Sequence, residues 1–207
     1  MNVSVKSNFH DLPKDMPLII PTPELIRKYG KEFDKDPAVK AITKLIKLMP
    51  RNDNMDDVLV KTAVINDLYS ANIYVARDVA KGIIAIAIQG LDRRISEGDV
   101  SVVEDVAIAG GGNRNYSFAT KYCSWHKPYK YPIFDSKVES LLTQYGLERI
   151  NPFSMDEPFT IPPGTNLRDY YTFRGIVDNF RKICRLEEIG YQALDKFLYL
   201  YAKERGL

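Results

Sequence analysis

The chain has 207 residues, 45% of them hydrophobic and 27% charged, and a formal net charge of +2 at pH 7. This is the composition of an ordinary globular protein, and so small a net charge means that any contact with nucleic acid must come from local patches. Two cysteines are too few for a disulfide scaffold. The longest aliphatic run, residues 83–88, is far shorter than the roughly 20 residues that cross a bilayer. We therefore expect a cytoplasmic protein without a membrane partner.

The first 50 residues predict an arm followed by two helices. Residues 1–22 contain Pro13, Pro17 and Pro21 and are expected to be extended. Thr22 followed by Pro23, and Asp36 followed by Pro37, are typical helix starts; they predict helices over about 23–33 and 36–49. The second helix carries a basic face, which is either a solvated surface or a set of phosphate contacts: Lys40, Lys44, Lys47 and Arg51.

The remaining elements also read as helices. Residues 55–71 predict a third helix, residues 72–98 a long and mostly buried one, and residues 99–112 a short one that ends in three glycines. Further helices are expected at about 115–126, 135–145, 167–183 and 188–204, with a proline-rich loop at 151–166. Only residues 158–162 hint at strand-like alternation. The sequence predicts an all-α fold, with residues 23–207 forming a single compact domain of roughly eight helices.

The stretch from Val106 to Phe134 has an unusual composition. It contains no acidic residue but holds four cations and, before Phe134, six aromatic residues, and Asp135 follows directly. Three of the rings are spaced as a core stripe on the predicted helix: Phe118, Tyr122 and Trp125. Lys121 falls on a different side. Asp135 is then either a simple N-cap or a carboxylate with a chemical role.

The glycine turn at 110–112 leaves the first amide groups of the next helix free to approach a phosphate. Together with the neighbouring polar and basic residues it predicts a nucleic-acid-binding set: Gly111, Gly112, Arg114, Ser117, Lys127 and Lys130. The turn lacks the Gly-Lys-Ser/Thr of a phosphate loop. A zinc site would need Cys123, His126 and every other cysteine and histidine of the chain. We therefore expect neither a cofactor nor a metal.

Residues 110–147 resemble a divergent helix-hairpin-helix DNA glycosylase. That superfamily has a glycine-rich hairpin, a helix with a catalytic lysine, and a crossing segment of the type Pro-[Ile/Val]-Asp-x-x-Val, which "PIFDSKV" at 132–138 matches. The "LLTQYGL" that follows corresponds to the family's leucine-rich helix ending in glycine. The similarity is to the 8-oxoguanine-glycosylase-like branch seen in bacterial proteins, with residues 99–147 as the hairpin region.

The resemblance implies base-excision repair of DNA. Asp135 would stabilise the positive charge that develops on the sugar, and Lys121 would attack the sugar and form a Schiff base. The family lysine lies about one helical turn earlier, near Ser117, so lyase activity is expected only if Lys121 lies in the pocket. The alternative is a non-catalytic helical module that binds nucleic acid or an acidic protein. Whether Asp135 faces a pocket or only caps its helix distinguishes the two.

Overall fold

The computed structural model describes residues 16–207, and within this range it contains ten α-helices and no β-strand. The all-α prediction is confirmed. The helices are α1 (Pro23–Phe33), α2 (Pro37–Leu48), α3 (Met55–Tyr69), α4 (Ala76–Ala87), α5 (Leu91–Glu97), α6 (Ser101–Ile108), α7 (Tyr116–His126), α8 (Ser136–Leu147), α9 (Tyr170–Ile183) and α10 (Tyr191–Glu204).

Side-chain caps begin several of these helices at the predicted residues. Thr22 accepts a hydrogen bond from the Leu25 amide at the start of α1, and Asp36 accepts one from the Ala38 amide at the start of α2. Each cap is followed by a proline, whose missing N–H costs nothing at the first helical position. The local sequence thus fixes where both helices begin.

The long helix expected over residues 72–98 is interrupted and becomes α4 and α5, which together with the other eight expected helices makes ten. Asn72 lies in a loop with a φ of 59°, and α4 begins only at Ala76. Gly90 then adopts a φ of 80° and separates α4 from α5. A left-handed residue cannot continue a right-handed helix, and glycine is the residue that adopts this conformation without a steric penalty.

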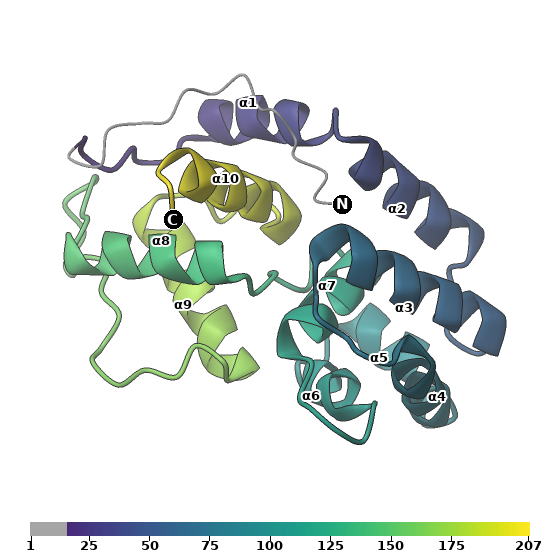
Figure 1. The fold of residues 1–207 in the computed structure, drawn as a ribbon. Coiled ribbons are helices and arrows are strands. Elements are labelled where there is room, and N and C mark those ends of the chain that lie inside the picture. Colours follow the sequence, from purple (N-terminus) through teal and green to yellow (C-terminus); the bar gives the residue numbers. More distant parts are fainter. Residues whose placement is uncertain (1–15) are drawn as a thin grey trace.

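The helices form two groups joined by α7 and the segment that follows it (Figure 1). Helices α2 to α7 pack against one another, and α1 leaves them to pack on α10, which also contacts α8. Residues 16–22, the described part of the predicted arm, are not helical and are held to the C-terminal helices. The Ile19 amide donates to the Tyr201 hydroxyl at 2.9 Å, and the Tyr145 hydroxyl donates to the Ile19 carbonyl.

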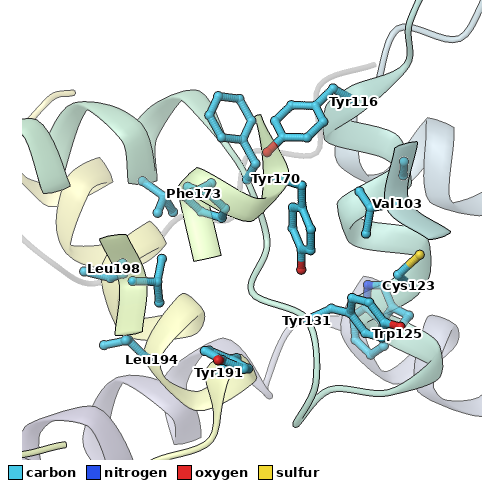
Figure 2. Close-up of a cluster of buried hydrophobic side chains, with 14 of the residues drawn as sticks. Val103, Tyr116, Cys123, Trp125, Tyr131, Tyr170, Phe173, Tyr191, Leu194 and Leu198 are labelled. Atoms are coloured by element: carbon cyan, nitrogen blue, oxygen red, sulfur yellow. The ribbon is translucent and has the colours of Figure 1, made fainter. Parts of the chain in front are cut away.

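Aromatic side chains fill the space between the two groups. Figure 2 shows Tyr170 between Phe173 on one side and Tyr131 and Trp125 on the other. The Tyr170 hydroxyl donates to the Pro132 carbonyl at 3.1 Å, which ties the start of α9 to the segment after α7. The core stripe predicted on α7 is confirmed, since Phe118 and Tyr122 are fully buried and Trp125 is 8% exposed.

Helices α4 and α6 approach each other unusually closely at Gly82. A Cβ atom on this glycine would lie 1.7 Å from the carbonyl oxygen of Ala109, which directly follows α6. Only a residue without a side chain allows this contact. The contact places the glycine turn at 110–112, and therefore the start of α7, relative to the rest of the first group.

No helix in the described part of the chain is both long enough and apolar enough to cross a membrane.

Candidate functional site

A pocket of about 350 Å³ lies between the two groups of helices. Its walls come from the end of α1 and the start of α2, the end of α3, helix α7, the segment up to the start of α8, and helix α10. A volume of this size is in the range of small-molecule and nucleobase sites. Both residues that the sequence singled out for chemistry, Lys121 and Asp135, line it.

Lys121 projects from α7 and is almost completely buried, with 3% of its surface exposed. Its Nζ donates to the Ser117 hydroxyl at 2.6 Å and to Asp135 Oδ2 at 3.3 Å. Burial lowers the pKa of Lys121 below its ordinary value, although the Asp135 carboxylate partly offsets this. A lysine in such surroundings becomes a neutral amine, and therefore a nucleophile, more readily than one in water.

Asp135 caps α8 and also contacts the lysine. One carboxylate oxygen, Oδ1, accepts the amide hydrogen of Lys137 at 3.0 Å, and the other accepts from Lys121. The two interpretations of this residue are therefore compatible, because the cap fixes the carboxylate at the N-terminus of α8 while its second oxygen belongs to the pocket wall. Its side chain keeps 20% of its surface exposed.

Helix α7 places Lys121 and Ser117 side by side near Asp135. Lys121 and Ser117 are four residues apart on α7 and therefore lie on the same face. The Ser117 hydroxyl also donates to the Phe134 carbonyl at 3.2 Å, directly before Asp135. The long side chain of Lys121 thus reaches the Asp135 carboxylate, and the Ser117 hydroxyl orients its ammonium group.

Two pairs of aromatic rings face the pocket. The ring centroids of Tyr69 and Trp125 are 6.2 Å apart on one side, and those of Phe33 and Tyr199 are 6.2 Å apart on the other. The Lys121 ammonium lies 5.8 Å from the centroid of the Tyr69 ring. Such rings can hold a flat ligand by stacking.

Asp195 of α10 is a buried carboxyl group in the pocket wall, and the sequence analysis missed it. It is 5% exposed, its Oδ2 accepts from the Ile133 amide at 3.0 Å, and its Oδ1 is buried without a hydrogen-bond partner. Burial raises the pKa of Asp195 well above its ordinary range; the Ile133 amide opposes this rise, and the charge of Asp135 adds to it. A signal was present, because Asp195 interrupts an apolar helical stripe between Tyr191 and Leu198.

None of the residues predicted to bind nucleic acid is among those that line the pocket, although Ser117 accepts a hydrogen bond from Lys121 in its wall. Gly111 and Gly112 are exposed in the turn between α6 and α7, and Gly111 has a φ of 65°. Lys127 and Lys130 are exposed beyond the end of α7. Arg114 is instead held by protein groups, since it forms an ion pair with Glu104 and donates to the Arg168 carbonyl at 2.8 Å.

Lys61 is a second buried lysine, and its hydrogen bonds serve the structure of the helices around it. Lys61 of α3 is fully buried, and its ammonium donates to the carbonyls of Met49 and Arg51 and to the side chain of Asn52 at 2.6 Å. It thereby satisfies acceptors at the end of α2 and in the loop that follows. Tyr122 of α7 donates to the same Asn52 oxygen, which connects this cluster to the site helix.

Among the described residues, no group of three or more histidine, cysteine, aspartate or glutamate side chains is placed to hold a metal ion. Cys123 and His126 are on α7, and Cys123 is buried. His10, the other histidine of the chain, lies outside the described residues.

Comparisons with known proteins give one family and one relative. A family model named HI_0787_N, described as an N-terminal domain, matches residues 24–130, just over half of the chain. An "Uncharacterized protein" of Haemophilus influenzae is 35% identical over 153 residues, which cover 72% of this chain and 68% of the relative. No solved structure matches. The residues matched by the family model include Lys121 and end before Asp135.

Proposed function

The chain belongs to the HI_0787_N family, and we propose that it is a DNA N-glycosylase that removes a damaged base from a nucleotide rotated into the pocket between the two groups of helices. The observation that carries the proposal is the contact of 3.3 Å between Lys121 Nζ and Asp135 Oδ2 in the wall of this pocket. It joins an amine and a carboxylate, the two groups that the resemblance requires, at a site large enough for a base.

The carboxylate has the charge that the reaction needs. Breaking the bond between a base and deoxyribose leaves positive charge on the sugar, and a fixed carboxylate stabilises that charge without reorganising. The cap contact with the Lys137 amide holds Asp135 in place. Its Oδ2 is available to the sugar once Lys121 moves toward the substrate.

The amine supplies a nucleophile. Lys121 in its neutral form can attack the sugar carbon from which the base departs. The bond from that carbon to the ring oxygen then breaks, the ring oxygen takes up a proton and becomes a hydroxyl, and the opened sugar is left as a Schiff base with the lysine. Its burial favours the neutral form, and the Ser117 hydroxyl keeps the amine directed toward Asp135. We therefore propose lyase activity in addition to base release.

The aromatic pairs supply the contacts for the base. An extruded base loses its stacking in the duplex at a cost of a few kcal/mol, and stacking on protein rings compensates for this loss. Phe33 with Tyr199, and Tyr69 with Trp125, offer such faces in the pocket. The groups that we propose contact the DNA backbone are all exposed: Gly111, Gly112, Lys127 and Lys130.

The test is an excision assay on a panel of duplexes, each with one damaged base, combined with borohydride trapping. Wild-type protein should release at least one base and form a trapped complex. Asp135→Asn should slow release by about 100-fold or more, the scale of a lost preorganised electrostatic group. Lys121→Gln should abolish trapping, whereas Lys182→Gln, on the exposed surface of α9, should leave both readouts unchanged.

The same experiment can reject the proposal. If wild-type protein releases no base from a broad panel but binds duplex, the chain is a non-catalytic nucleic-acid-binding module. If it neither releases a base nor binds duplex, DNA is removed from its partners. Full activity of Asp135→Asn would show that the carboxylate is only a helix cap.

A further inference from the structure

We propose that Asp195 is the general acid of this pocket, a catalytic residue that protonates the base as it leaves. The inference rests on the proposed function and adds a residue from α10, on a different helix from Lys121 and Asp135. The pocket would then hold a pair of carboxyl groups with different tasks, one at the start of α8 and one on α10.

The geometry around Asp195 is unusual for a structural residue. Oδ2 has the Ile133 amide as a donor, but Oδ1 is buried and has no partner among the described residues. A buried polar atom without a partner costs about 1–3 kcal/mol, so it is a feature that folding alone does not favour. Because Asp195 lines the pocket, a small rotation of its carboxyl group can turn this oxygen toward a ligand, which then supplies the missing partner.

Burial and the charged groups of the pocket wall favour a protonated Asp195. Two lysines of the pocket wall are paired with other carboxylates, since Lys121 donates to Asp135 and Lys196 donates to Asp34 at 2.7 Å. The pocket wall also contains the carboxyl groups of Glu32, Asp36 and Asp67 and the ammonium group of Lys203. Burial and the charge of Asp135 favour the protonated form of Asp195. Because Oδ2 accepts the Ile133 N–H, Oδ1 is the oxygen that carries the proton in the protonated form.

Two carboxyl groups whose surroundings separate their proton affinities are the arrangement used to cleave glycosidic bonds. The bond between the sugar carbon and the base nitrogen breaks, and its electron pair goes to the base. The proton on Asp195 Oδ1 moves to an acceptor atom of the base ring, and Asp195 becomes a carboxylate. Asp135 stabilises the positive sugar until water or the Lys121 amine adds to it. The proton lost by that nucleophile returns to Asp195.

The test compares leaving groups. Asp195→Asn keeps an oxygen for the Ile133 amide but cannot donate a proton to the base, so it should fold normally. It should slow release of a neutral base by about 100-fold or more, the usual contribution of general acid catalysis. A fluorinated version of the same base is nearly the same size but leaves more easily without a proton, and its release should be slowed much less. Asp156→Asn, at an exposed loop residue, is the control.

A second readout does not depend on activity. Carbon-13 NMR of labelled aspartate should show one carboxyl that stays protonated at neutral pH in the wild type and is missing in Asp195→Asn. Equal slowing of both bases, or no slowing, overturns the acid role while leaving the proposed glycosylase intact. An ionised Asp195 at neutral pH also overturns it. Absence of any excision by the wild type overturns both proposals together.

Discussion

Replacing Gly82 with alanine tests how the site helix is positioned. The new Cβ would lie 1.7 Å from the Ala109 carbonyl oxygen, so α4 and the end of α6 must separate by more than about 1 Å to restore an ordinary contact. Both sides are helix backbone, which cannot rotate away as a side chain can. Overpacking of a core costs about 1–3 kcal/mol and occasionally more, and we expect about 3 kcal/mol here.

The measurement is thermal and urea unfolding of the purified variant. For a protein of this size, about 3 kcal/mol corresponds to a fall in Tm of roughly 6–12 °C. The matched control is Gly175→Ala, in the middle of α9, where a Cβ meets nothing within 4 Å. Because alanine is the better helix former, this change should stabilise the protein by about 0.5–1 kcal/mol. Equal effects of the two substitutions would refute the close-contact argument.

Three further predictions concern charge. Burial lowers the pKa of Lys61 to about 8, so between about pH 8 and 10.5 the native state binds fewer protons than the unfolded chain. The free energy of unfolding of the wild type, relative to that of Lys61→Met, should therefore rise with pH in this window, as urea titrations can measure. The raised pKa of Asp195 changes stability in the opposite direction, because above about pH 4 the native state keeps a proton that the unfolded chain loses. Asp195→Asn should therefore gain stability over the wild type as pH rises from about 4 toward neutrality. If the protein binds duplex, Lys127→Gln should reduce the slope of log K against log salt by about 0.9, whereas an unchanged slope would exclude a phosphate contact at this residue.

The local sequence was sufficient for the helix starts and for the buried stripe on α7. Thr22 with Pro23, Asp36 with Pro37, and Asp135 are caps whose partners lie within three residues. Such contacts do not depend on the rest of the fold, so a pattern of residue types predicts them. The break at Gly90 was missed because the apolar residues on both sides of the glycine continue a helical pattern.

The surroundings of Asp195 on α10 could not be predicted from the neighbouring sequence. Asp195 reaches the pocket because α1 and α8 pack on α10. This packing brings Asp195 beside Ile133, which stands some 60 residues earlier in the chain. Its partner, the Ile133 amide, can be identified only once the helices are assembled. The same holds for Lys61, whose acceptors lie at the end of a different helix.

Patterns of residue types were enough to predict a helical chain, the starts of most helices, and Lys121 and Asp135 as candidate site residues. The contact between these two residues could not be predicted, because it depends on how the segment 127–135 crosses from α7 to α8. The tertiary structure also decided which rings and acids share the pocket. The packing of the helices decides which side chains are buried and which distant segments form hydrogen bonds. Packing depends on the whole set of side chains rather than on any one stretch of sequence.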